Sequence, residues 1–196
     1  MSDNPATAEA NPVFGSKYNS AVADFAVPKQ AYLAAHPDAP FGYIATSALV
    51  LDLTTTSNPQ ILLLQRVASD EDPNKWEPPG GACDDEDETV LHGVARELLE
   101  EAGLEAEYID GPVGEPHFFT LDDGKKVCQF NFAVRPKHNG KASLAVLLNP
   151  EEHQQFVWAT ESEVKAGKAG GIDLDFTREE VKRTVLQAFD FARNFR

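Results

Sequence analysis

The feature that most constrains this chain is a concentration of acidic residues around one amphipathic helix. Between residues 84 and 110 there are eleven acids and a single base, Arg96. The segment Thr89–Ala102 has the periodicity of a helix, and Gly103 follows where a left-handed C-terminal cap would lie. One face of this helix carries leucine, valine and alanine side chains. We therefore expect a helix that packs on a core and presents acids on its other side.

Three glutamates lie close together on the polar face of the predicted helix. Glu97, Glu100 and Glu101 fall within an arc of about 100° on a helical wheel. Like charges at this spacing cost about 0.2–0.5 kcal/mol per pair, and more where water is excluded. A divalent cation would relieve this repulsion, because clustered carboxylates suit Mg²⁺ or Mn²⁺. The alternative for an arbitrary helix of this kind is a solvated acidic face.

The overall charge limits the partners of the chain. Its 196 residues include 32 acids and 17 lysines and arginines, which gives a net charge of -15. This charge opposes binding to nucleic-acid polymers and to anionic membranes. The chain shows no spanning segment or signal peptide in its sequence, and Cys83 and Cys128 lie in no metal-binding motif. We expect a soluble, cytoplasmic protein in a reducing compartment.

The order of predicted elements indicates an α/β protein. Residues 1–27 are expected to form a flexible tail, and residues 28–196 a single domain. The predicted elements are a short helix at residues 28–36, strands at 41–53 and 60–67, a hairpin with strands at 115–121 and 125–135, a strand at 154–159 and a C-terminal helix after Thr177. Helices around a mixed sheet are the simplest architecture for this order.

The segment from Pro79 to Leu104 resembles the Nudix box, G-x5-E-x7-R-E-U-x-E-E-x-G-U, in which U is a bulky aliphatic residue. Eight positions match in one register: Glu88, Arg96, Glu97, Leu98, Glu100, Glu101, Gly103 and Leu104. The first glycine of the pattern falls on Ala82, so either the loop carries one extra residue or alanine replaces glycine. Trp76 before the PPGG sequence and the preceding LLLQR strand also resemble the family.

This resemblance implies a Nudix-type α/β/α sandwich with a central mixed β-sheet. It also implies an Mg²⁺- or Mn²⁺-dependent hydrolase in which water attacks phosphorus in the diphosphate of a nucleoside diphosphate linked to another moiety. The substrate could be a nucleotide sugar, a dinucleotide or a nucleoside triphosphate. The alternatives are a non-catalytic Nudix-fold binding module and an isoprenoid-diphosphate hydrolase or isomerase. Dimers are common in the family, so a homodimer is compatible with the resemblance.

By the same resemblance, Glu97, Glu100 and Glu101 bind the metal, and Glu100 or Glu101 accepts the proton of the attacking water. The backbone carbonyl of Gly81 is the expected additional ligand. Arg96 is expected to pair with Glu88 or the other carboxylates and to hold their geometry.

Each remaining candidate residue has both a functional and a structural interpretation. Glu88 could support catalysis or simply favour the helix dipole. Arg66 is a candidate for gripping phosphate, and Trp76 for stacking on a base. Glu151 and Glu152 lie in a predicted loop at a place where some Nudix enzymes supply a further base or metal ligand, but acids at a helix start are the preferred interpretation. His153 is interpreted as a structural histidine.

Overall fold

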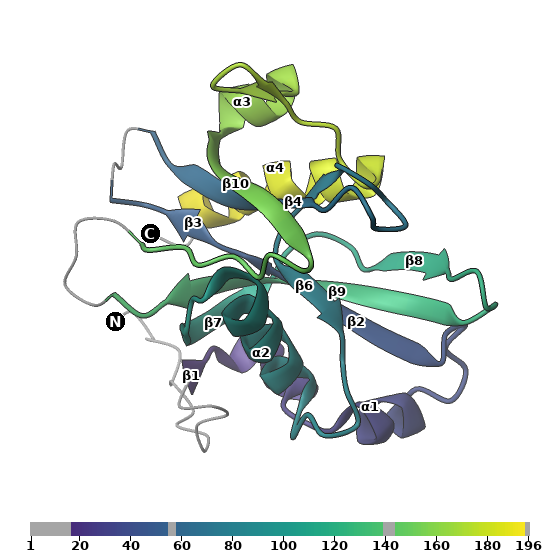
Figure 1. Ribbon diagram of the computed structural model, residues 1–196. Coiled ribbons are helices and arrows are strands. Elements are labelled where there is room, and N and C mark those ends of the chain that lie inside the picture. Colours follow the sequence, from purple (N-terminus) through teal and green to yellow (C-terminus); the bar gives the residue numbers. More distant parts are fainter. Residues whose placement is uncertain (1–16, 55–57, 139–143, 195–196) are drawn as a thin grey trace, which may run out of the picture.

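A mixed β-sheet forms the centre of the computed structural model, which describes residues 17–54, 58–138 and 144–194 (Figure 1). Its strands are β1 (Lys17–Tyr18), β2 (Tyr43–Leu49), β6 (Gly80–Ala82), β7 (Ala106–Pro112), β8 (His117–Thr120) and β9 (Lys126–Pro136). Their order is β1-β7-β9-β2-β6, and β8 pairs with the remaining part of β9. Strands β2 and β9 run parallel, whereas β2 and β6 run antiparallel. The predicted central mixed sheet is therefore confirmed.

A second, antiparallel sheet lies beside the first. It contains β3 (Leu51–Asp52), β4 (Gln60–Arg66), β5 (Trp76–Glu77) and β10 (His153–Thr160). The single strand predicted over residues 41–53 is interrupted at Val50, where the chain passes from the mixed sheet to the antiparallel one. The Val50 carbonyl accepts a hydrogen bond from the backbone N–H of Leu62. A short ribbon of β11 (Lys168–Ala169) and β12 (Ile172–Asp173) follows.

Helices lie on both sides of the sheets (Figure 1). They are the 3-10 helix η1 (Ser20–Phe25) and the α-helices α1 (Lys29–Ala35), α2 (Val90–Ala102), α3 (Glu161–Ala166) and α4 (Glu179–Asn194). The predicted central helix is confirmed as α2: the Thr89 side chain caps its start, and Gly103 ends it with a φ of 64°. No helix in the described ranges has both the length and the apolar character that crossing a bilayer requires.

Strand β4 connects two hydrophobic clusters because it is buried on both faces. Leu62 and Leu64 pack with α2, while Ile61 and Leu63 pack with α4. All four side chains are fully buried. This arrangement explains the uninterrupted ILLL run, which predicts a strand covered on both sides. It also fixes α2 against the centre of the molecule, where the helix can carry a site.

The N-terminal segment packs more extensively than the sequence predicts. Strand β1 pairs with β7, Val22 is fully buried, and the Phe25 ring contacts the rings of Tyr32, Phe130 and Phe132. The prediction of a flexible tail through residue 27 is therefore wrong for residues 17–27, and residues 1–16 lie outside the described part. Irregularly spaced aromatic residues give no periodic signal, although they cover the sheet.

We expect Phe25→Ala to lower the free energy of unfolding by about 3 kcal/mol, because it removes a ring packed among three others. Phe118→Ala is the matched control, since that ring is 60% exposed, and should cost less than about 1 kcal/mol. Urea denaturation measures both. Equal effects would show that the segment does not contribute to the core.

Candidate active site

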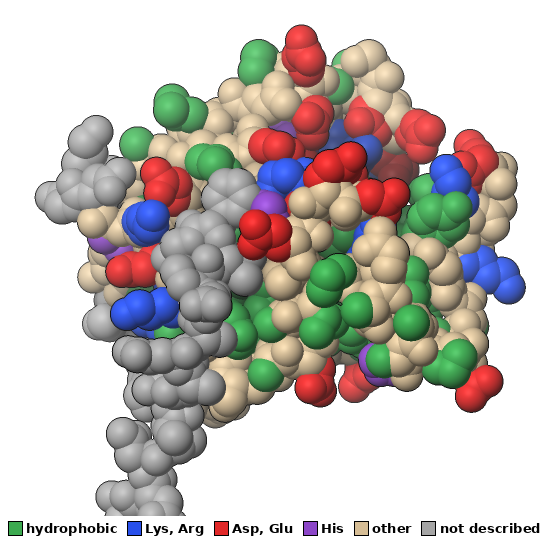
Figure 2. Space-filling model, turned by 90° about the horizontal axis from the view of Figure 1, so that it is seen from below, with side chains coloured by type: hydrophobic (Ala, Val, Ile, Leu, Met, Phe, Trp, Pro, Cys, Tyr) green, Lys and Arg blue, Asp and Glu red, His purple; other side chains and the backbone are tan. Residues whose placement is uncertain are grey.

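A cavity of about 360 Å³ lies between α2, strand β6, the end of β4 with the loop after it, and the start of β10. Five acidic residues contribute to its wall: Asp70, Glu97, Glu100, Glu101 and Glu152. Two arginines, Arg66 and Arg96, lie among them. Acidic side chains also spread over the surface seen in Figure 2, where basic ones are few. Acidic side chains are therefore common over the surface of the molecule and are concentrated in the cavity.

Glu97 and Glu101 are the most deeply placed of these acids, with only 8% and 4% of their surface exposed. One carboxylate oxygen of Glu101, Oε2, accepts a hydrogen bond from the backbone N–H of Gly80 at 2.7 Å. Burial raises the pKa of Glu97 to about 7 despite the opposing effect of Arg96. Burial also raises the pKa of Glu101 well above its ordinary value. A nearby positive charge would therefore favour the ionised forms of both buried carboxylates.

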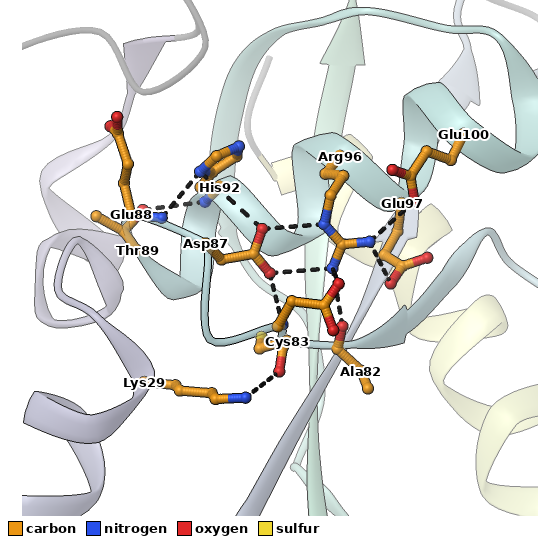
Figure 3. A network of polar contacts seen from close by, with 11 residues as sticks. Lys29, Ala82, Cys83, Asp87, Glu88, Thr89, His92, Arg96, Glu97 and Glu100 are labelled. Atoms are coloured by element: carbon orange, nitrogen blue, oxygen red, sulfur yellow. Dashed lines mark hydrogen bonds and ion pairs between the residues drawn. The ribbon is translucent and has the colours of Figure 1, made fainter.

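Arg96 joins the helix to the preceding loop through five hydrogen bonds (Figure 3). Its Nε and Nη2 atoms donate to the two oxygens of Asp87 at 2.9 and 3.0 Å. Its Nη1 donates to Glu97 at 3.0 Å and to Glu100 at 2.9 Å. Nη2 also donates to the Ala82 carbonyl at 2.9 Å. All five guanidinium N–H groups are used, so Arg96 holds carboxylates of the helix and of the loop together.

The loop acids that pair with Arg96 are Asp87 and, at 3.5 Å, Asp84, whereas the box pattern has its first acid at Glu88. Asp87 is 5% exposed, and although burial opposes its ionisation, bonds from Arg96 and the Asp84 N–H lower its pKa. Glu88 is exposed, and its backbone N–H donates to Nδ1 of His92. Asp87 stands five intervening residues after Gly81, which is the spacing that the box pattern gives from glycine to its first acid. One extra loop residue before Arg96 accounts for this arrangement.

Gly81 lies directly against one of the glutamates. A Cβ at this position would lie 2.7 Å from Oε1 of Glu97, so only glycine permits this approach. The neighbouring Ala82 carbonyl already accepts a bond from Arg96. This turn therefore brings the backbone of Gly81 against Glu97, while the adjacent carbonyl of Ala82 is bonded to Arg96.

The two predicted substrate-binding residues occupy different environments. Arg66 lines the cavity, but its guanidinium is paired with Asp70 and Glu77. Trp76 is fully buried in the hydrophobic cluster that contains α4, so its ring has no free face for stacking on a base. The sequence signal for Trp76 thus reflects packing.

The structure brings two further residues to the cavity that the sequence interpretation sets aside. Glu152 and His153 line it, and one ligand atom each from Glu101, Glu152 and His153 lies within 4.8 Å of the others. The helix predicted to start at Glu151 and Glu152 is absent, because these residues form a turn before β10. Glu151 is exposed and does not line the cavity. Only proximity in the fold could reveal this grouping.

The donor set fits a divalent metal ion. Carboxylates of Glu97, Glu100 and Glu101 and the carbonyl of Gly81 are hard oxygen ligands on one wall of the cavity. Burial raises the pKa of both Glu97 and Glu101, and a bound cation would favour their ionised forms. Such a site could hold a metal and, through it, the phosphates of a substrate.

We expect Asp87→Asn to lower the free energy of unfolding by about 3 kcal/mol, because it removes a buried charge bonded twice to Arg96. Glu88→Gln is the neighbouring control, and its exposed side chain should contribute less than about 0.5 kcal/mol. Chemical denaturation compares the variants. A larger loss in Glu88→Gln would restore Glu88 as the partner of Arg96.

Comparisons with known proteins agree with this geometry. The family model described as NUDIX domain matches residues 44–179. The MutT protein from Methanosarcina mazei Go1 is 26% identical with a TM-score of 0.54, over 77% of this chain and 94% of that chain.

Two more distant solved structures share the fold. The NUDIX domain of Shewanella oneidensis NrtR, complexed with ADP ribose, is 16% identical with a TM-score of 0.56, over 83% of this chain and 98% of that chain. A C. elegans Ap4A hydrolase is 20% identical with a TM-score of 0.52, over 77% and 99%. No curated protein matches the chain. Since the family model matches more than half of the sequence and includes the residues around the cavity, the chain belongs to the Nudix family.

Proposed function

We propose that the protein is an Mg²⁺-dependent hydrolase, able to use Mn²⁺ as well, that cleaves the diphosphate linkage of a nucleoside diphosphate joined to another moiety. The observation that carries this proposal is the burial of Glu97 and Glu101 in a cavity where acids outnumber arginines. A purely binding module has no physical need for such mutually repelling side chains. A metal ion and an anionic substrate together would satisfy them.

In this proposal some residues bind the metal, and others orient the metal-binding carboxylates. Glu97, Glu100, Glu101 and the Gly81 carbonyl would hold the metal, which when bound neutralises phosphate charge and lowers the pKa of water. Arg96 keeps Glu97 and Glu100 at fixed positions. The Gly80 N–H holds Glu101. A carboxylate of the cavity then accepts the proton of the water that attacks phosphorus.

Similar proteins support a nucleotide substrate. The NrtR domain was determined with ADP ribose, and the C. elegans relative is named an Ap4A hydrolase. Both names describe a nucleoside joined through phosphates to another moiety. For this chain we propose the same class, which includes nucleotide sugars, dinucleotides and nucleoside triphosphates. A binding module and an isoprenoid-diphosphate enzyme are alternative outcomes of the experiment below.

We place the activity in the cytoplasm, because Cys83 and Cys128 are both free thiols, as in a reducing compartment. A homodimer is also part of the proposal, on the basis of the family resemblance. Light scattering during gel filtration would test it.

We expect Glu101→Gln to lower turnover at least about 100-fold, because it removes the charge of a buried metal ligand and keeps its shape. The assay measures phosphate release from nucleotide sugars, dinucleotides, nucleoside triphosphates and isoprenyl diphosphates, with and without Mg²⁺. Glu151→Gln is the control, since this exposed neighbour of Glu152 lies outside the cavity. It should retain full turnover.

Metal-independent turnover, or equal turnover in both variants, would contradict the proposed metal site. Metal and nucleotide binding without turnover would indicate a binding module. Activity confined to isoprenyl diphosphates would replace the proposed substrate class.

We expect the increase in melting temperature caused by Mg²⁺ to grow with pH up to about pH 7 and then level off. The ion binds ionised carboxylates, so below the pKa of Glu97 it must first displace a proton, and its affinity falls as pH decreases. Thermal melts at about pH 5.5 and about pH 8, with and without metal, measure the difference. A larger shift at the acidic pH would contradict this assignment.

A further inference from the structure

Glu152 and His153 face Glu101 across the cavity, although about fifty residues separate them in sequence. One ligand atom from each side chain lies within 4.8 Å of the others, and this trio is the compact group of potential metal ligands in the described ranges. Glu97 and Glu100 line the same cavity without belonging to this group. The spacing is small enough for one ion to contact all three after modest side-chain rotation.

The backbone holds this trio in place. The N–H of Asn149 donates to the carbonyl of Glu101 at 3.2 Å, which ties the turn before β10 to the end of α2. The Asn149 side chain donates to Glu152 at 2.8 Å, and the His153 N–H donates to the Asn149 carbonyl at 2.9 Å. The three side chains therefore project from a connected and fixed framework, as a metal site requires.

His153 is buried at the wall of the cavity. The side chain is 3% exposed, lines the cavity, and its Nδ1 has no hydrogen-bond partner within the described residues. Because a buried polar atom without a partner is costly, this ring has bonding capacity that a ligand would use. The pairing of β10 with β4 shifts register between His153 and Gln155, and such bulges re-aim side chains beside active sites.

We propose that His153 supplies a nitrogen ligand to a divalent cation shared with Glu101 and Glu152, which shifts the preference of the centre from Mg²⁺ toward Mn²⁺ and Co²⁺. This inference rests on the proposed function, because Glu101 belongs to both ligand sets. Imidazole is a softer ligand than carboxylate or water and favours first-row transition ions over Mg²⁺. A centre with oxygen ligands alone would lack that additional preference.

The test compares metal binding by the full chain and its variants. Calorimetric titrations of the metal-free protein with Mg²⁺ and with Co²⁺ give the ratio of the two dissociation constants. His153→Gln should reduce the preference for Co²⁺ at least about 10-fold. His117→Gln, a change at another buried histidine that lies outside the cavity, and Glu151→Gln should leave the ratio unchanged.

A second measurement uses only the unaltered chain and therefore does not depend on the folding of a variant. Pulsed electron paramagnetic resonance of the Mn²⁺-loaded protein should detect coupling to a coordinated histidine nitrogen. Absence of this coupling, or an unchanged ratio in folded His153→Gln, would overturn the inference while leaving the proposed function intact. Failure of the unaltered chain to bind either metal would overturn both.

Discussion

The bonds of Arg96 are the interaction on which the rest of the site depends. They use the whole guanidinium to join the loop, through Asp87 and Ala82, to Glu97 and Glu100 on the helix. This arrangement fixes the carboxylates but cannot neutralise all of them, because one positive charge serves several acids. Glu101, held only by a backbone N–H in the described contacts, remains buried beside them. The site therefore has a local excess of negative charge, which a bound cation would neutralise.

Local sequence patterns predict the elements that carry this site. The helix α2 follows from its periodicity, its Thr89 cap and Gly103, and the burial of β4 follows from its unbroken apolar run. The break at Val50 and the packing of Phe25 escape such reasoning, because both depend on contacts with distant segments. Periodicity describes which face of an element is apolar, but not which partner will cover it.

The same distinction applies to the candidate site. The spacing of the box identifies the acids of α2 and the arginine among them, because those positions follow one another along a single helix. The pattern has its first acid at Glu88, whereas the loop acid that bonds to Arg96 is its neighbour Asp87, as one extra loop residue would produce. It gives no sign of Glu152 or His153, which reach the cavity only when β10 pairs with β4. Trp76, whose position before the PPGG sequence resembles the family, packs in the hydrophobic core and does not reach the cavity.

The most direct test of this account is a crystal structure of the protein with Mn²⁺, in which anomalous scattering locates the ion. We expect a peak in the cavity, within coordination distance of Glu97, Glu101 and the Gly81 carbonyl, about 2.0–2.3 Å from each oxygen. An ion bound only elsewhere, or an empty cavity at saturating Mn²⁺, would contradict the claim that these buried carboxylates form a metal centre.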